Sequence, residues 1–289
     1  MSKITAVLKQ LKPNLKSVSF ELIHNKKVLN LEEITKLSPL FCSVTWLDNN
    51  LKDLESHPSV SLAKELIKND LNVILHLPGK IFDRETAIKL LNLAQSIGIR
   101  NILALQGEYS LWKDVAKDDF PFAKDLVEFI KENYKDYFCV GITGYPSGHH
   151  RVATLELDTK YLKEKSLKAD FIITQAVFDV ASLKSFYKRC EDNDINLPII
   201  PGIFIINSHD SLMHMIKLCK LTLPEQVKDF LENNKNNKEV IKNYGIESAI
   251  NVIGGLLSDE EVSIKCVHIF TMNNFENVKE VLKIVKPAG

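Results

Sequence analysis

Hydrogen-bonding side chains stand where short apolar runs of the sequence end. Glu21 follows Phe20 at the end of one run, His76 lies near the end of another, and Gln175 closes the run "FIITQ". A carboxyl group at the end of an apolar strand is partly desolvated, which raises its pKa and suits it to donate a proton. A glutamine amide can both donate and accept a hydrogen bond. These residue types are typical of a polar pocket that handles a small molecule and a proton.

Other apolar runs end in the same way. The further polar residues at such ends are Thr45, Gln106, Gly107, Glu108, Thr143, Tyr145, Thr271 and Asn273. Taken singly, each could simply mark a strand that becomes a loop. One shared pocket explains all of them more economically, provided that the fold gathers these strand ends at one place.

The runs themselves predict such a fold. Eight β-rich runs occupy residues 18–23, 41–46, 72–77, 101–106, 138–143, 170–175, 198–203 and 266–271. Amphipathic helical patterns separate them, most clearly after Asp83, an expected N-cap, where Ile88, Leu91 and Ala94 share a face and Gly98 is an expected C-cap. Strands that alternate with helices in this number predict an α/β fold, a (β/α)₈ TIM barrel. In such barrels the active site lies at the C-terminal ends of the strands.

A doubly wound open sheet is the alternative fold. It is disfavoured because a glycine-rich turn is expected after its first strand, and "FELIHNKK" has none. The polar segment 225–240 is expected to be a long loop or a helix and loop before the last helix. We therefore expect one catalytic barrel over residues 1–289, with residues 1–16 as an N-terminal helical extension.

Composition excludes several classes of function. Lys+Arg and Asp+Glu are both 37, so no net charge points to nucleic acid or a membrane surface. The five cysteines are scattered without a CxxC pair, which indicates buried thiols in a reducing compartment and no metal site. We expect no signal peptide, no membrane span and a cytoplasmic protein with a small-molecule partner. A homo-oligomer or a subunit of a complex remains open.

Longer motifs carry a resemblance to a known family. "VSFEL", "CSVTW", "NILALQGE", "VGITGYPSGHH", "ADFIITQAVFD", "LPIIPGIFII" and "HIFTMNN" follow one another from about residue 17 onwards. In this order they resemble the methylenetetrahydrofolate reductases, in the short form that consists of the catalytic barrel. The resemblance implies FAD as cofactor and NADH or NADPH as electron donor. It implies reduction of 5,10-methylenetetrahydrofolate to 5-methyltetrahydrofolate, in one-carbon metabolism and methionine biosynthesis.

The resemblance also implies roles for individual residues. Glu21 matches the acid of the family's "FE" motif and would protonate the departing nitrogen of the folate, while Gln175 would hydrogen-bond its pterin. Glu108 completes the expected catalytic set. The substrate-binding residues implied are Glu21, Gln175, Phe230, Met272 and Asn274.

A larger set is implied for FAD. Gly107 would let the backbone approach the flavin ring, and Phe122 with Ala123 would lie near the adenine portion. Asp158 and Lys165, seven residues apart on one helix face, would meet the ribose and the phosphates. The full set is Thr45, His76, Leu105, Gln106, Gly107, Glu108, Phe122, Ala123, Thr143, Tyr145, His149, Asp158 and Lys165.

The sequence departs from the family pattern at three places, one of which is "LIHNKK" in place of the aromatic-proline run that follows the "FE" motif. Gln106 and Glu108 stand where Arg-Gly-Asp is usual, and Asn274 replaces an arginine expected to help hold folate. The departures leave open a divergent paralogue that acts on another folate one-carbon state or with a different electron donor. A non-catalytic folate- or flavin-binding barrel subunit is also open. A Schiff-base lyase is disfavoured because no strand ends in a lysine. NADH is slightly preferred, because no arginine cluster for a 2′-phosphate is legible.

Overall fold

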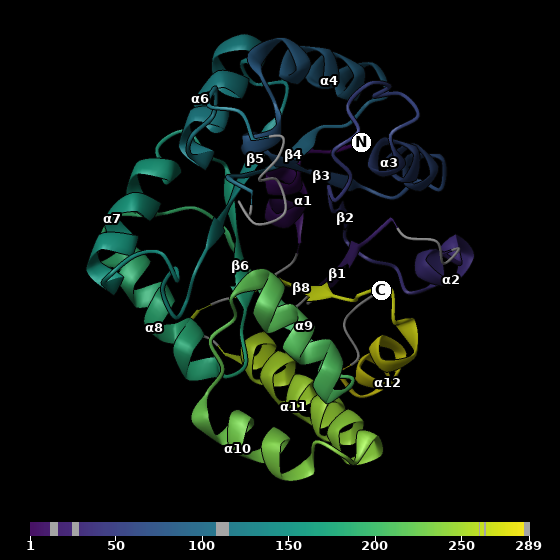
Figure 1. The fold of residues 1–289 in the computed structure, drawn as a ribbon, viewed down its shortest axis with the longest axis vertical. Coiled ribbons are helices and arrows are strands. Elements are labelled where there is room, and N and C mark those ends of the chain that lie inside the picture. The colour runs from purple at the N-terminus through teal and green to yellow at the C-terminus, as the bar shows by residue number, and fades with distance from the viewer. Residues whose placement is uncertain (12–16, 25–28, 108–115, 260, 263, 286–289) are drawn as a thin grey trace.

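Eight parallel strands close into a barrel in the computed structural model of the protein (Figure 1). The structure describes residues 1–11, 17–24, 29–107, 116–259, 261–262 and 264–285. Strand order follows chain order, and β1 pairs with β8 to close the ring. The strands are β1 Ser17–Leu22, β2 Cys42–Val44, β3 Val73–Pro78, β4 Asn101–Leu105, β5 Cys139–Gly144, β6 Phe171–Ala176, β7 Ile199–Phe204 and β8 Cys266–Phe270.

The helices lie around the outside of the barrel, except for α1, which lies over its middle (Figure 1). They are α1 Ile4–Gln10, α2 Leu31–Lys36, α3 Pro58–Lys68, the 3₁₀ turn η1 Gly79–Ile81, α4 Arg84–Ser96, α6 Ala123–Tyr134, α7 Leu155–Ser166, α8 Val180–Glu191, α9 His209–Cys219, α10 Glu225–Asn234, α11 Lys238–Ser258 and α12 Phe275–Val285. The predicted (β/α)₈ barrel is confirmed, and each predicted strand is present to within a few residues. Within the described ranges, the structure contains no helix with the length and apolarity that a membrane crossing requires.

Helix α4 shows why the local signals worked and where one failed. The carboxylate of Asp83 accepts a hydrogen bond from the N–H of Thr86 at 2.8 Å, and Gly98 follows the helix at φ +85°. The predicted N-cap is therefore confirmed, whereas the C-cap is Ile97 and Gly98 follows it in the left-handed conformation that commonly ends a helix. The prediction for Ile88 was wrong, since this side chain is 38% exposed. The buried stripe begins one residue earlier and consists of Ala87, Leu90, Leu91 and Ala94.

The polar segment before the last strand is a helix followed by a short loop. Helix α10 runs from Glu225 to Asn234, and Asn237 then caps α11 by accepting from the N–H of Val240 at 3.2 Å. Helix α11 passes very close to the chain that leaves β7. A Cβ atom on Gly245 would lie 1.9 Å from the carbonyl oxygen of Ile206, so only glycine permits this approach.

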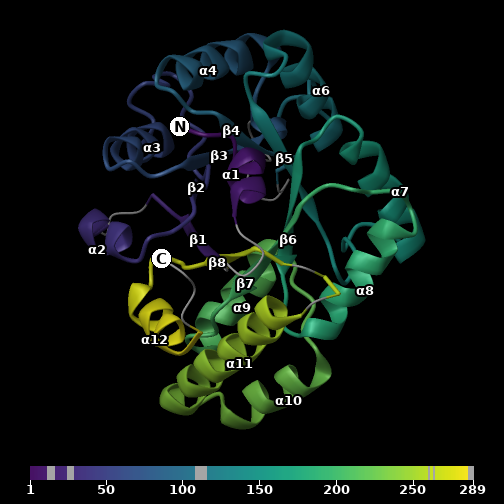
Figure 2. The ribbon, with the colours of Figure 1, turned by 180° about the vertical axis from the view of Figure 1, so that it is seen from behind.

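Alternating residues of each strand face the surrounding helices and the lumen. In β1, Val18, Phe20 and Leu22 belong to the apolar core under the helices, whereas Ser19 and Glu21 alternate with them. The N-terminal end of the lumen is closed by α1, which lies across the middle of the barrel in Figure 2. Its apolar residues pack into one cluster with lumen residues of the strands: Ile4 and Leu8 with Ile74, Leu103, Phe171 and Ile200.

The opposite end carries a second apolar cluster, which we call the α9–α11 cluster. It joins side chains of the three helices to residues at the ends of β7 and β8. Its buried members are Phe204, Ile206, Leu212, Met215, Leu221, Leu223, Val227, Leu231 and Ile241, with Phe270 and Met272 packed against them. The lumen is thus filled from the N-terminal end, and the polar strand ends gather at the C-terminal end.

Candidate active site

The side chain of Glu21 places a carboxyl group at the C-terminal end of the barrel. Its Cα lies in register with Ser43 of β2 on one side and with Phe270 of β8 on the other. Burial raises the pKa of the Glu21 carboxyl to about 7. Near neutral pH a substantial fraction of Glu21 therefore carries a proton that it can donate.

His268 forms a buried polar network at the level below Glu21. Its Nδ1 lies 2.8 Å from the hydroxyl of Ser19 and its Nε2 lies 2.9 Å from the hydroxyl of Ser43. The Ser19 hydroxyl also donates to the carbonyl oxygen of Val267 at 3.2 Å, so it accepts from Nδ1–H and the Ser43 hydroxyl donates to Nε2. Burial lowers the pKa of His268 to about 3. The imidazole is therefore neutral, and the network ties β1, β2 and β8 together.

His76 is different, because it is buried without a hydrogen-bond partner for Nε2 among the described residues. Burial lowers its pKa to about 4, so the ring is neutral at physiological pH. A buried nitrogen without a partner costs about 1–3 kcal/mol. A ligand with a complementary polar atom would remove this cost, which fits the predicted place of His76 in a cofactor site.

The end of β4 brings Gln106 and Gly107 beside Lys80 of η1. The Gln106 side chain donates to the carbonyl oxygen of Pro121 at 2.8 Å, and the backbone carbonyl oxygen of Gln106 accepts from the N–H of Lys80 at 3.0 Å. Gly107 has φ +90°, a conformation that favours glycine. Leu105 is partly buried. The prediction for Glu108 lies outside the described residues. Lys80 was missed by the sequence analysis, because it follows a strand end by two residues.

Asp158 and Lys165 lie on the face of α7 that meets the end of β5, as their spacing predicted. The Lys165 ammonium donates to the carbonyl oxygen of Thr143 at 3.0 Å and lies 5.7 Å from the centre of the Tyr145 ring. Burial lowers the pKa of Lys165 to about 8, an effect that the nearby Asp158 carboxylate partly offsets. Burial raises the pKa of Asp158, and the positive charges of Lys165 and Arg189, together with a hydrogen bond from the His149 N–H, counteract this shift. The largely desolvated cation of this pair, the Lys165 ammonium group, therefore lies near the C-terminal end of β5.

Arg189 of α8 fixes the loop that follows β5. Its guanidinium donates to the carbonyl oxygens of Tyr145 and Pro146, both at 3.2 Å. The Tyr145 ring meets that of His149 edge-on at 4.5 Å, and burial lowers the pKa of His149 to about 4. Sequence reasoning missed Arg189 because it comes from a helix more than forty residues further along the chain.

The remaining residues that we expect to bind the cofactor are Thr45, Phe122 and Ala123. Thr45 is half-buried, and its N–H donates to the carbonyl oxygen of Leu22 at 3.1 Å. Phe122 directly precedes α6 and is 57% exposed, whereas Ala123 is buried. An exposed aromatic ring is free to stack on a flat ligand.

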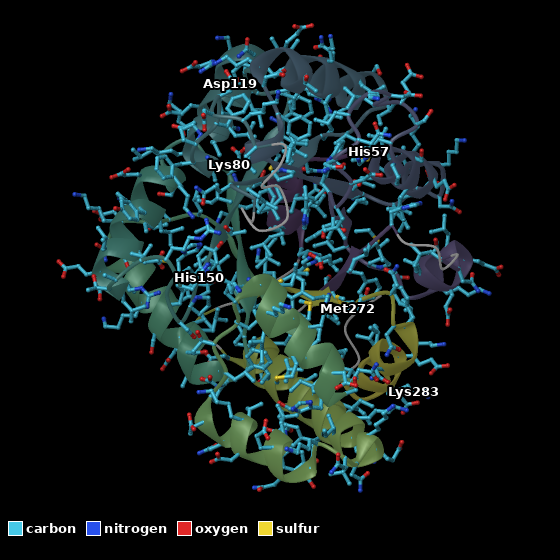
Figure 3. The ribbon with its side chains drawn as sticks, viewed as in Figure 1. His57, Lys80, Asp119, His150, Met272 and Lys283 are labelled. Carbon is cyan, nitrogen blue, oxygen red and sulfur yellow. The ribbon has the colours of Figure 1, made fainter. Side chains whose placement is uncertain are left out.

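Gln175 is the last residue but one of β6 and is half-buried; its side-chain oxygen accepts from the N–H of Ala176 at 3.0 Å. Among the expected folate residues, Met272 packs against the α9–α11 cluster, toward the middle of the molecule in Figure 3. The N–H of Asn274 donates to the carbonyl oxygen of Thr271 at 2.8 Å, within the turn after β8. Phe230 lies on α10, where its ring stacks on Tyr244 with centroids 3.9 Å apart. One face of the Phe230 ring is therefore already covered by protein.

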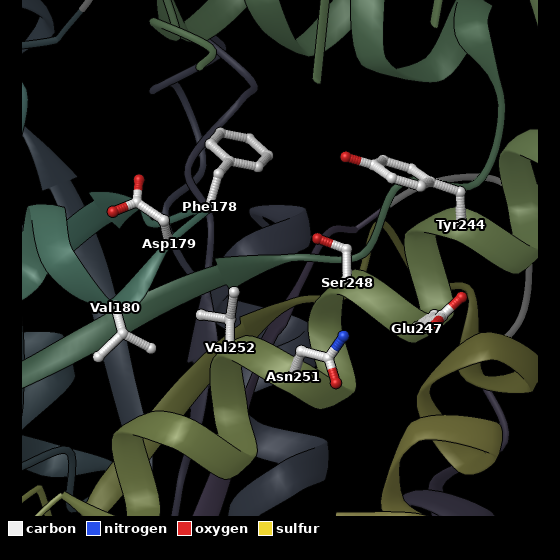
Figure 4. A pocket seen from close by; sticks show the side chains of 8 residues that line it. All are labelled: Phe178, Asp179, Val180, Tyr244, Glu247, Ser248, Asn251 and Val252. Carbon is white, nitrogen blue, oxygen red and sulfur yellow. The ribbon is translucent and has the colours of Figure 1, made fainter. Parts of the chain in front are cut away.

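A pocket of about 440 Å³ lies apart from these residues, between the chain after β6 and α11 (Figure 4). None of the predicted site residues lines it. The carboxylates of Asp179 and Glu247 line it, and no lysine or arginine does. Such a lining repels the phosphates and carboxylates of flavin, nicotinamide and folate cofactors. The described residues also contain no group of three His, Cys, Asp or Glu side chains that could hold a metal ion.

The sequence matches known proteins along most of its length. The family model for methylenetetrahydrofolate reductase matches residues 17–286. Methylenetetrahydrofolate reductase 2 of Schizosaccharomyces pombe is 35% identical over 288 residues, covering 92% of this chain and 44% of that protein. Methylenetetrahydrofolate reductase (NADH) 1 of Arabidopsis thaliana is 30% identical and is covered to 42%. The chain thus spans less than half the length of these two relatives.

A bacterial relative and a solved structure extend the comparison. The 5,10-methylenetetrahydrofolate reductase of Pectobacterium carotovorum is 28% identical, and the match covers 86% of this chain and 80% of that one. An uncharacterised Clostridium thermocellum protein that binds two copies of 5-methyl-5,6,7,8-tetrahydrofolic acid has a TM-score of 0.63 at 16% identity, over 96% of this chain and 98% of that one. At this identity the likeness shows the fold alone. By its family-model match and its sequence identities, the chain belongs to the methylenetetrahydrofolate reductase family.

Proposed function

We propose that the protein reduces 5,10-methylenetetrahydrofolate to 5-methyltetrahydrofolate with FAD as cofactor and a reduced nicotinamide as electron donor. Membership of the family supports the reaction. The observation that carries the proposal is the Glu21 carboxyl, which lies at the C-terminal end of the barrel with a pKa of about 7. Opening of the methylene bridge requires a proton on the departing nitrogen, and this group can supply it at neutral pH.

The neighbours of Glu21 keep the proton available. Its neighbour on β8 is the apolar Phe270, and burial is the cause of the raised pKa of the carboxyl. The Thr271 hydroxyl fixes the backbone at this point by donating to the carbonyl oxygen of Glu21 at 2.6 Å. Glu21 is therefore a positioned acid on a rigid strand, as general acid catalysis requires.

The residues at the other strand ends fit FAD. Among the described residues, His76 has a buried Nε2 without a hydrogen-bond partner. Gly107 has a positive φ and no Cβ, so a ligand can approach its backbone closely. The ring of Phe122 is exposed. Lys165 would hold a phosphate oxygen with a desolvated ammonium group. Bound FAD would supply hydride transfer from the nicotinamide to the folate in one place.

We favour NADH over NADPH as the donor. A 2′-phosphate is usually held by arginine, and three of the four arginines of this chain make contacts elsewhere in the protein. Arg84 lies over the rings of Phe120 and Phe129, Arg100 lies over Tyr137, and Arg189 holds the loop after β5. This part of the proposal is tested by the ratio of kcat/KM for the two nicotinamides.

The visible absorption spectrum of the purified protein is the first test. Stoichiometric FAD that bleaches anaerobically with NADH, and regains its absorbance when methylenetetrahydrofolate is added, supports the proposed reaction. Flavin that bleaches but is not reoxidised by this folate contradicts the substrate and favours the divergent paralogue. A protein that neither contains nor takes up FAD contradicts the flavoenzyme and favours a folate-binding barrel without redox chemistry.

A further inference from the structure

The ladder between β6 and β7 loses one step close to the C-terminal ends of the strands. Thr174 and Gln175 of β6 together face a single residue of β7, Pro201, and regular pairing resumes beyond them. Two residues opposite one constitute a β-bulge, a device that turns a side chain in a new direction. The bulge therefore lies at the residue that we expect to contact the pterin.

The hydroxyl of Thr174 replaces the missing ladder contact. It accepts a hydrogen bond from the N–H of Gly202 at 3.0 Å and donates one to the carbonyl oxygen of Gln175 at 2.8 Å. The side chain is 1% exposed, so water cannot take over either bond. The hydroxyl thus satisfies the Gly202 donor while it holds the backbone of Gln175 in its displaced position.

The β7 side of the bulge has one residue that this geometry needs. The N–H and the carbonyl oxygen of Gly202 both point toward β6, since they bond the Thr174 hydroxyl and the Val177 N–H. Gly202 has no side chain, and a Cβ there would lie 2.4 Å from the carbonyl oxygen of Thr174 and 2.6 Å from the Phe270 ring. The motifs "ITQ" and "PGI" are therefore the two halves of one bulge.

The bulge also determines which end of the Gln175 amide is free. The N–H of Ala176 lies 3.0 Å from the Gln175 side-chain atom assigned as oxygen. A backbone N–H can only donate, so this atom must be the amide oxygen and not the nitrogen. Among the described residues the structure gives the amide nitrogen of Gln175 no hydrogen-bond partner. Gln175 therefore presents an N–H₂ donor to a ligand, while its oxygen already accepts one hydrogen bond from the backbone.

We propose that Thr174 is a positioning residue that sets Gln175 as a hydrogen-bond donor, and that the site thereby selects a reduced pterin with a carbonyl oxygen at C4. The inference rests on the proposed function and goes beyond it, since it assigns a role to Thr174 and a polarity to Gln175. A ring that carries an amino group in place of the carbonyl would direct a donor at a donor and bind more weakly.

Ligand affinity tests the polarity of Gln175. The probes are tetrahydrofolate and its 4-amino-4-deoxy analogue, titrated against the FAD-loaded protein by calorimetry. The wild type should prefer the carbonyl compound by about 10-fold or more, and Gln175→Glu, which keeps an acceptor for Ala176 N–H but loses the donor, should abolish or reverse this preference. Equal affinity of the wild type for both pterins, or an unchanged preference in Gln175→Glu, would overturn the inference.

Two substitutions test Thr174. Thr174→Val keeps the shape but removes the hydroxyl, and it should raise KM for methylenetetrahydrofolate about 10-fold or more while NADH reduces the flavin at an unchanged rate. Thr174→Ser keeps the hydroxyl and should restore KM. Hydrogen exchange of the Gly202 amide should accelerate in the valine variant and not in the serine variant. An equal loss of both half-reactions, or an unchanged Gly202 exchange rate, contradicts the positioning role.

Failure of this inference can be told apart from failure of the proposed function. A wild-type protein that turns over methylenetetrahydrofolate but binds both pterins equally overturns the donor assignment alone. A wild-type protein that binds neither pterin overturns the proposed substrate and this inference with it. The exchange of the Gly202 amide does not depend on either ligand.

Discussion

The hydroxyl of Thr271, at the end of β8, donates a 2.6 Å hydrogen bond to the backbone carbonyl oxygen of Glu21, near the end of β1. These residues are 250 positions apart in the sequence, and they meet because β8 pairs with β1 to close the barrel. Because the Thr271 hydroxyl donates its hydrogen to the backbone of Glu21, it does not donate to the Glu21 carboxyl group. Closure of the barrel therefore fixes the backbone of the proposed acid and leaves its proton free for chemistry.

Replacement of the proposed acid should separate the two half-reactions. In Glu21→Gln, reduction of the flavin by NADH should proceed at the wild-type rate, whereas reoxidation by methylenetetrahydrofolate should fall by about 100-fold or more, the usual contribution of a general acid. Anaerobic stopped-flow absorbance measures both steps. Loss of both steps, or of neither, would remove Glu21 from the role of acid.

The same carboxyl should make stability depend on pH in a defined direction. Its pKa is raised from 4.5 to about 7 in the folded state, so the folded protein binds more protons than the unfolded chain between these values. The folded protein is therefore most stable, as far as Glu21 is concerned, below pH 4.5, where the carboxyl is protonated in both states. This stability is lost as the pH rises through about 7.

Glu21→Gln removes this dependence. At about pH 9 the variant should unfold with a free energy up to ~3 kcal/mol higher than the wild type, an upper limit from a shift of about two and a half pKa units. At about pH 4 the two proteins should differ little. Urea denaturation at both pH values is the measurement, and a difference of equal size at both would show that Glu21 is not desolvated.

Loss of the Lys165 ammonium should weaken FAD binding. Lys165→Met removes a desolvated cation beside Thr143, so the dissociation constant of FAD should rise about 10-fold or more, as expected for a charge-assisted hydrogen bond to a phosphate. Quenching of FAD fluorescence on titration with apoprotein gives the constant. Lys160→Met, on the exposed side of the same helix, is the matched control and should bind FAD as the wild type does.

Two glycines of α11 should respond in opposite directions to alanine. Gly245→Ala places a Cβ 1.9 Å from the carbonyl oxygen of Ile206, so the helix must move, at a cost of about 2–4 kcal/mol in unfolding free energy. Gly254→Ala meets nothing within 4 Å and should stabilise the helix by about 0.5–1 kcal/mol. Thermal unfolding distinguishes the pair. A neutral Gly245→Ala would mean that α11 does not pass this close to the end of β7.

The sequence by itself determined the elements and the set of polar strand ends. Strands that alternate with capped amphipathic helices can bury their apolar faces in few ways, and a closed parallel barrel is the one that this number of strands favours. Asp83 and Gly98 mark the ends of α4 through bonds that span only a few residues. Local signals of this kind are legible in a linear sequence because the partners lie within one turn.

Only the tertiary structure decided which of these residues act together. Thr271 meets Glu21, Arg189 holds Pro146 in the loop after β5, and Thr174 meets Gly202, each pair across a strand or helix contact that no local pattern encodes. The pKa values of the buried groups depend in the same way on the dielectric environment that neighbouring elements create. The sequence supplies the chemical groups, and barrel closure supplies the distances and the desolvation that give them distinct roles.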